Sequence, residues 1–205
     1  QVMQPSSLSL SYFSSLYLSL EPSTVDLSNK FVEDYQAWTL TREKPLTGAA
    51  RADHAVLGFV SEIGELLSGL KRHLIYNQPL DMLNFIEEIG DCCFYLAMCA
   101  NIGQTKLEPI FVYEPSVGTE SADTIAVALD CISILELQLY NLRLGKANRV
   151  PLNHILANLQ WLLLENSCSL KQCLDFNQAK LTTRYPLGYT DEHAKLRLDK
   201  QGEQK

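Results

Sequence analysis

The chain has few basic residues and no long apolar run, and these two absences argue against two large classes of protein. Its 205 residues include 17 Lys and Arg against 24 Asp and Glu, which gives a formal net charge of −7. A groove for the nucleic-acid backbone needs clustered basic side chains, so we expect no nucleic-acid partner. No apolar run reaches the roughly 18–20 residues that a membrane-spanning helix needs, so we expect no membrane partner either. The hydrophobic content of 46% is that of an ordinary globular protein.

The six cysteines include no Cys-x-x-Cys pair, and most of them lie in apolar stretches that we expect to be helical. We therefore predict buried, reduced thiols with a structural role, which indicates a reducing compartment. The N-terminus has no Lys or Arg ahead of its leucine-rich part, so it is unlike a secretory signal. The expected location is the cytoplasm.

Two four-residue motifs, each with an acid at both ends, are the most informative feature of the chain. They are Glu62-Ile63-Gly64-Glu65 and Glu88-Ile89-Gly90-Asp91. On a helix, acids three residues apart lie on the same side, one turn from each other. Only a short loop separates the motifs, so two antiparallel helices can direct all four carboxylates at one point. Converging carboxylates repel one another unless hard cations lie between them, and Mg²⁺ is the usual cation where the substrate is a phosphate. The predicted metal ligands and catalytic residues are Glu62, Glu65, Glu88 and Asp91.

The spacing of apolar residues predicts an all-α fold, a helical bundle. Helical character begins near Asn29, and further helices are expected over about 53–75, 82–102, 119–145 and 151–181. The expected core stripe of the second helix is Val56, Val60, Ile63, Leu67 and Leu70. That of the third is Ile86, Ile89, Cys93, Leu96 and Ala97. Asp81 is the expected N-cap of the third helix.

The acidic side of the 82–102 helix continues directly into Phe94, Tyr95 and Met98. A solvated acidic face normally stays polar along its length, so we expect the acids at the mouth of a partly buried pocket. The alternative is that Glu-x-x-Glu is only a common surface pattern. Gly64 and Gly90 favour the pocket, because each glycine costs a helix interior about 1 kcal/mol against Ala and leaves room for a neighbouring helix.

The two ends of the chain and its second half are organised differently. Residues 1–28 alternate Ser with Leu or Tyr, which favours a short strand or non-helical arm, with a loosely ordered tail as the alternative. A single helical domain is expected over 29–199, with a tail over 200–205. The last two predicted helices resemble a degenerate copy of the first helical hairpin that has lost its acids. Chance similarity between leucine-rich helices is the alternative. Leu159, Gln160 and Leu163 stand near the positions of Glu87, Glu88 and Asp91.

Several of these residues together resemble a known family. The N-terminal part of the resemblance is His54-x-x-x-Gly58-x-x-x-Glu62-x-x-Glu65, then Lys71, Asp81 and Glu87-Glu88-x-Gly90-Asp91. The C-terminal part is Asn177-x-x-Lys180-Leu181-x-x-Arg184-Tyr185-Pro186-x-Gly188-Tyr189. This combination resembles the all-α, MazG-like nucleoside triphosphate pyrophosphohydrolases of phage and bacteria. It covers about 31–111 and 170–199, and the stretch 112–169 is interpreted as an insertion or degenerate repeat.

The resemblance implies an Mg²⁺-dependent enzyme, with Mn²⁺ able to substitute, that cleaves nucleoside triphosphates between the α- and β-phosphates. The four acids would hold one or two metal ions, and Glu62 is our candidate for activating the attacking water. Glu87 would either orient a ligand or be a surface acid. The implied substrate-binding residues are His54, Lys71, Asn177, Lys180 and Arg184. Family members usually close the site with a second subunit, so we expect a homodimer or higher homo-oligomer.

Two other functions stay open on the sequence. One is the hydrolysis of a signalling nucleotide such as a guanosine polyphosphate, and the other is a helical module that senses nucleotide or metal without turnover. Phe94, Tyr95 and Trp38 are candidates for an apolar wall on which any base could stack. A di-iron carboxylate bundle needs Glu-x-x-His, and neither acid motif has the histidine.

Overall fold

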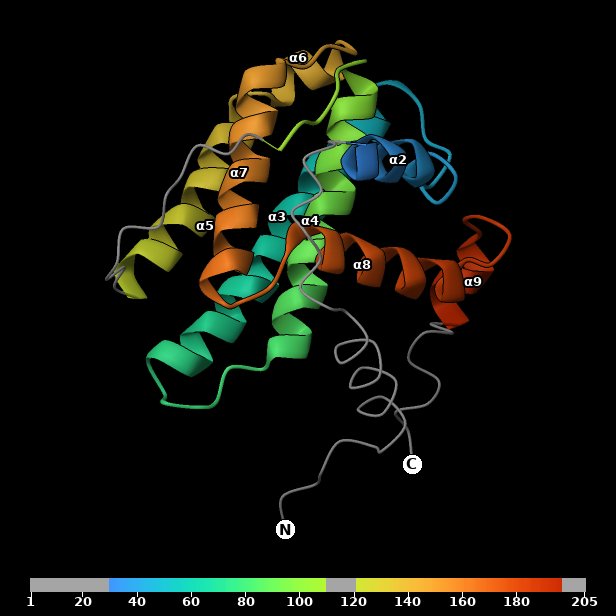
Figure 1. The fold of residues 1–205 in the computed structure, drawn as a ribbon. Coiled ribbons are helices and arrows are strands. Elements are labelled where there is room, and N and C mark those ends of the chain that lie inside the picture. The colour runs from blue at the N-terminus through green and yellow to red at the C-terminus, as the bar shows by residue number, and fades with distance from the viewer. Residues whose placement is uncertain (1–29, 110–120, 197–205) are drawn as a thin grey trace.

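The computed structural model describes residues 30–109 and 121–196, and in these ranges the chain forms eight helices and no strand (Figure 1). The helices are α2 (Lys30–Thr39), α3 (Gly48–Leu74), α4 (Met82–Ile102), α5 (Ser121–Glu136), α6 (Leu139–Arg143), α7 (Arg149–Glu165), α8 (Leu170–Arg184) and α9 (Asp191–Leu196). The predicted all-α fold is confirmed. The predicted N-terminal arm and the tail over 200–205 lie outside the described residues.

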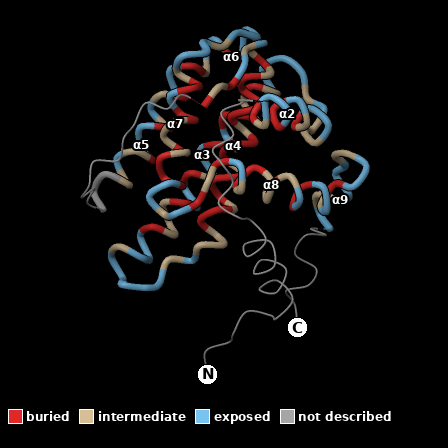
Figure 2. Tube along the Cα trace, in the orientation of Figure 1, coloured by how far each residue is buried: buried red, intermediate tan, exposed pale blue. Residues whose placement is uncertain are grey.

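Helix α4 is the centre of the molecule. Helices α2, α3, α7 and α8 all pack against it, and α5 and α6 pack on the neighbouring α3 (Figure 1). The sequence of α4 is apolar on almost every side, so the helix can be buried nearly all round, and Figure 2 shows it as largely buried. One continuous hydrophobic core joins α2 through α8. None of the described helices is long and apolar enough to cross a membrane.

Of the two helices in the first hairpin, α4 begins where the sequence predicts, and α3 begins earlier than predicted. Asp81 caps α4 as expected, and its Oδ1 accepts a hydrogen bond of 3.1 Å from the backbone N–H of Asn84. Helix α3 begins at Gly48 rather than near Asp53. The reason is that Ala49, Ala50 and other strong helix formers continue the helix toward the N-terminus.

The predicted helices over 119–145 and 151–181 are each divided in two, so this part of the prediction was wrong. A break after Glu136 separates α5 from the short α6. A turn over 166–169 ends α7 and starts α8. Ser167 adopts a positive φ of 59°, and Ser169 forms a capping box with Gln172 at the start of α8. Because of this turn, α8 is free to leave α7 and cross α4 (Figure 1).

The buried face of α3 is wider than its predicted core stripe. Val60 is 36% exposed, whereas Phe59 and Leu66 are buried beside the predicted Ile63. The difference arises because α3 is packed by α5 and α6 as well as by α4. In α4, Met98, which follows the acids on the same side of the helix, is fully buried. All six cysteines are free and buried, as predicted.

Candidate metal centre

Three of the four predicted acids converge. Glu62 and Glu65 project from α3 and Glu88 from α4, and a carboxylate oxygen of each lies within 4.8 Å of the others. Glu88 is only 5% exposed, Glu62 is half-buried and Glu65 is exposed. The helical spacing predicted from the sequence therefore produces a real cluster, open to solvent on the side of Glu65. A set of donors made only of carboxylate oxygens suits a hard divalent cation.

The cluster raises the pKa of its own members. Burial, followed by the negative charges of Asp91, Glu88 and Glu65, raises the pKa of Glu62 to about 8. Burial and the charge of Glu65 raise the pKa of Glu88 to about 7, while the hydrogen bond between Glu62 and Glu88 acts against the rise. The protein matrix does not compensate these charges, so a proton or a cation is needed to neutralise them.

Asp91, the fourth predicted ligand, lies beside the cluster with its oxygens already occupied. Its Oδ1 accepts a hydrogen bond of 2.6 Å from Asn177 Nδ2, and its Oδ2 accepts one of 2.5 Å from Lys180 Nζ. It is near enough for its charge to raise the pKa of Glu62. The structure therefore brings Asp91 to the site but not into the set of three converging carboxylates.

Helix α8 can reach the acids because Gly90 has no side chain. A Cβ at this position would lie 2.9 Å from the Cβ of Asn177. Asn177 is completely buried, and its Oδ1 accepts a hydrogen bond of 2.7 Å from the hydroxyl of Tyr35. The predicted close approach of a neighbouring helix is confirmed at Gly90. It is wrong at Gly64, where a Cβ would meet nothing within 4 Å.

Lys180 and Glu87 form the second link between α8 and α4. The Lys180 side chain is 6% exposed, and its Nζ contacts Glu87 Oε1 at 3.3 Å in addition to Asp91. Glu87 thus faces α8 and is not a surface acid. From the sequence, Lys180 and Asn177 are expected only as substrate contacts, whereas the structure gives both a positioning role toward Asp91. Tyr35, which supports Asn177, was missed as a site residue because its partner lies 142 residues away.

The other end of the α3–α4 face is aromatic. The ring of Tyr95 packs against Gly58, where a Cβ would lie 2.2 Å from Tyr95 Cε1. The ring of His54 meets Tyr95 edge-on at 5.7 Å between centroids, and its Nδ1 is buried with no hydrogen-bond partner among the residues that the structure describes. Burial and then the charge of Lys44 lower the pKa of His54. His54 therefore lies beside α4, about two turns of α3 from Glu62.

The remaining predicted residues differ in their distance from the site. Phe94 contacts Tyr95 edge-to-face at 5.6 Å, as an aromatic wall would require, whereas Trp38 packs with Tyr35 and Arg42. Burial, followed by the negative charges of Glu62 and Asp91, raises the pKa of Tyr95, and the positive charge of Arg184 acts against the rise, so Arg184 lies near Tyr95.

Lys71, a predicted substrate contact, lies away from the acid cluster. It is exposed in the last turn of α3. It follows Glu62 by nine residues, and about 100° per residue places it on the opposite side of the helix. The structure does not bring Lys71 to the acid cluster.

None of the protein-family models, curated proteins and solved structures compared with this chain matches it. The resemblance to the MazG-like family therefore depends on the motif residues and on the site that they form.

Proposed function

We propose that this protein is a Mg²⁺-dependent nucleotide pyrophosphohydrolase that cleaves nucleoside or deoxynucleoside triphosphates into a monophosphate and pyrophosphate. The convergence of Glu62, Glu65 and Glu88 within 4.8 Å supports the proposal most strongly. Bound Mg²⁺, or Mn²⁺ in its place, would neutralise phosphate oxygens and lower the pKa of a coordinated water. A divalent cation between carboxylates that repel one another removes the repulsion and stabilises their charged forms.

The protein residues have distinct roles in this proposal. Glu62 is our candidate for orienting the attacking water and removing its proton, because it is half-buried at the edge of the cluster. Asp91 adds a fourth carboxylate whose orientation is fixed by Asn177 and Lys180. Since Asn177 is buried and holds Tyr35 and Asp91, we assign it to positioning rather than to the substrate. His54 and Arg184 stay proposed substrate contacts.

A metal-sensing module without turnover is the second candidate. The observation that favours it is the engagement of Asp91 by Lys180, which leaves three converging acids where the resemblance to the pyrophosphohydrolases implies four. Three carboxylates are enough to bind a divalent cation, so metal affinity alone does not separate the two functions. The reaction product distinguishes the two functions.

The deciding experiment is a panel of all canonical NTPs and dNTPs with Mg²⁺, in which pyrophosphate and orthophosphate release are measured separately. We expect pyrophosphate from at least one nucleotide and no activity in excess EDTA. Orthophosphate as the sole product, or full activity in EDTA, would refute the proposal. Metal binding without hydrolysis of any nucleotide, signalling nucleotides included, would establish the sensing module instead.

We also propose that the protein is a cytoplasmic homo-oligomer. Large apolar side chains are exposed where α5, α6 and α7 meet, among them Leu137, Tyr140 and Val150. Where such side chains adjoin one another, they are typical of a subunit contact. Light scattering coupled to gel filtration should give a dimer or larger species, and a monomer at all concentrations would contradict this part of the proposal.

A further inference from the structure

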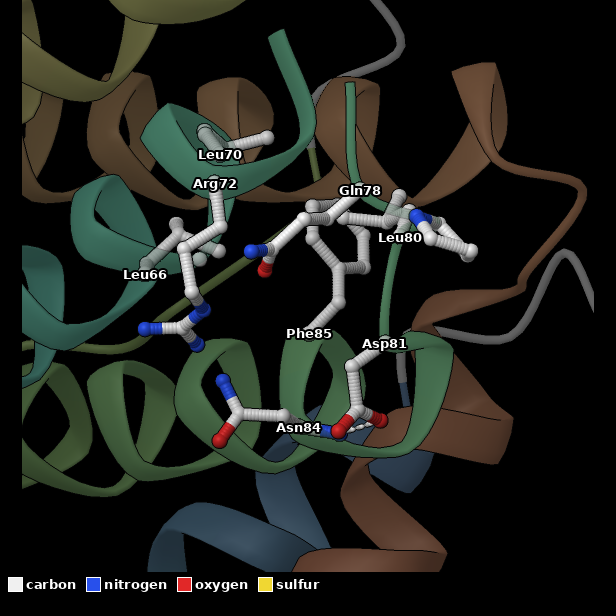
Figure 3. Close-up of a pocket in the computed structure, with 10 residues that line it drawn as sticks. Leu66, Leu70, Arg72, Gln78, Leu80, Asp81, Asn84 and Phe85 are labelled. Carbon is white, nitrogen blue, oxygen red and sulfur yellow. Dashed lines mark hydrogen bonds between the residues drawn. The ribbon is translucent and has the colours of Figure 1, made fainter. Parts of the chain in front are cut away.

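A pocket of about 300 Å³ opens at the loop end of the α3–α4 hairpin, on the far side of the acid cluster from Tyr95. Its floor is formed by Leu66, Leu70 and Phe85, each of which is at most 3% exposed (Figure 3). The volume is at the lower end of the range for small-molecule sites, so it suits one compact group rather than a whole nucleotide. The apolar floor can stack against a flat ring.

The rim of this pocket is polar, and its side chains make few hydrogen bonds to other described residues. Figure 3 shows the Arg72 guanidinium on one side, the Asp81 carboxylate on the other and the Asn84 carboxamide between them. Arg72 donates to Ser68 Oγ at 3.3 Å, and it has no carboxylate partner among the described residues. Asp81 accepts from the Asn84 backbone. Within the described part of the chain, the Asn84 carboxamide has no hydrogen-bond partner, so it is available to a ligand.

The pocket lies one helical turn from the proposed metal site. Gly69 follows Glu65 by four residues, and Asn84 precedes Glu88 by four, which on each helix is about 6 Å along the axis. A pentose provides a separation of this order between a base and the first phosphate of a nucleotide. A group in the pocket and a phosphate at the acids can therefore belong to one molecule.

We infer that this pocket receives the base of the nucleotide substrate and that it prefers guanine; the inference rests on the proposed function. The rim carries one positive and one negative group, so a polyphosphate tail would meet the Asp81 carboxylate as well as Arg72. Guanine presents the acceptors O6 and N7, the pair that an arginine fork recognises. Its N1–H and N2 amino group donate in parallel, and a carboxylate such as Asp81 accepts from both.

The other bases match this rim less well. Adenine and cytosine carry an amino group where guanine has O6, so they would present a donor to the Arg72 donors. Uracil and thymine have no exocyclic amino group for Asp81. The inference also places the base at the opposite end of the acid cluster from the aromatic wall of Phe94 and Tyr95.

The first test measures nucleoside binding without metal, in excess EDTA, by ligand-observed NMR titration. The wild-type protein should bind guanosine at least about tenfold more tightly than adenosine, cytidine or uridine, and Arg72→Ala should lose that tenfold preference. Lys146→Ala, an exposed basic residue outside the pocket, is the matched control and should keep it. Equal binding of all four nucleosides, no binding of guanosine, or an unchanged preference in Arg72→Ala would overturn the inference.

The second test uses Asp81→Asn, which keeps an equally good N-cap on α4 and replaces the carboxylate by an amide. The amide can accept from N1–H and donate to a carbonyl at C2, so binding should shift from guanosine to xanthosine with an unchanged melting temperature. Retained preference for guanosine would contradict the assignment of Asp81.

These assays also separate the two proposals. Guanosine binding together with no pyrophosphate release from any NTP or dNTP refutes the proposed activity and keeps the base pocket. Pyrophosphate release without preference for guanine nucleotides refutes the base pocket and keeps the proposed activity.

Discussion

The molecule contains two antiparallel helix pairs, α3–α4 and α5–α7. They bury different kinds of side chain. In α4 a carboxylate, Glu88, is 5% exposed. In α7, Gln160 stands near the position that would correspond to Glu88 and is half-buried, while Leu159 and Leu163, near the positions of Glu87 and Asp91, are fully buried. The pair α5–α7 packs against α3–α4 and contributes to the same core. The comparison teaches that the packing of such a pair needs no acids, so the acids of the first pair must serve another purpose.

A second difference lies in α8, which packs chiefly on α4. Its Asn177 and Lys180 approach α4 at Gly90 and Asp91. The first pair is thus supported on two sides, by α8 and by the second pair. Whether the second pair arose as a degenerate copy of the first stays a prediction.

The largest expected effect comes from removing an acid from the first pair. Glu65→Ala or Glu88→Ala should reduce turnover by more than ~100-fold, because even residues that only support a metal ligand are worth about 10–100-fold. Glu136→Ala, which removes an exposed acid from α5, should leave kcat unchanged. Steady-state pyrophosphate release measures both, and near-normal kcat of Glu88→Ala at saturating Mg²⁺ would remove the distinction between the pairs.

Within the first pair, the acids should have opposite effects on stability without metal. Asp91→Ala leaves Lys180 buried with Glu87 as its only acid, and breaking such a pair costs about 3–5 kcal/mol. Glu88→Gln relieves charge repulsion and should raise the free energy of unfolding. Urea denaturation in EDTA measures both variants. A stabilising Asp91→Ala would show that α8 does not depend on this ion pair.

The two motif glycines give a matched comparison of smaller size. Gly90→Ala forces a Cβ to 2.9 Å from Asn177, so displacement of α8 should cost about 1–3 kcal/mol. Gly64→Ala meets no atom within 4 Å and should stabilise the protein by up to about 1 kcal/mol through helix propensity. Thermal melts of the two variants should therefore shift in opposite directions, and equal shifts would mean that α8 is not held against Gly90.

The pH dependence of the metal-free protein tests the same acids without a substitution. The pKa values of Glu62 and Glu88 are raised to about 8 and about 7 from an ordinary value of 4.5, so the folded state binds more protons than the unfolded state between these pH values. The free energy of unfolding in EDTA should therefore fall as the pH rises from about 4.5 to about 8. The Glu62→Gln/Glu88→Gln double variant is the control and should show a flatter profile. Stability that rises with pH in the wild type but not in the control would contradict the raised pKa values.

The sequence was sufficient for features that depend on neighbours along one helix. The three-residue spacing of the acids predicted their convergence, and Asp81 predicted the start of α4. The turn before α8 was also detectable, because Ser169 and Gln172 form a capping box with a recognisable spacing.

Features that depend on contacts between distant segments could not be predicted. The period of α3 alone does not reveal that α5 and α6 would bury Phe59 while Val60 stays exposed. A lysine near acidic motifs is typical of a phosphate contact. Only the crossing of α8 over α4 shows that Lys180 instead binds Asp91 and Glu87. The pocket beside Arg72 likewise exists because the loop folds back between two helices.

The most direct test of the central claim, that the first helix pair alone binds metal, is anomalous diffraction from a crystal soaked with Mn²⁺. The account predicts anomalous density at the carboxylates of Glu62, Glu65 and Glu88, with one such site in each chain. Density beside Glu136 or Gln160 in the second pair, or none at the three converging acids, would contradict it.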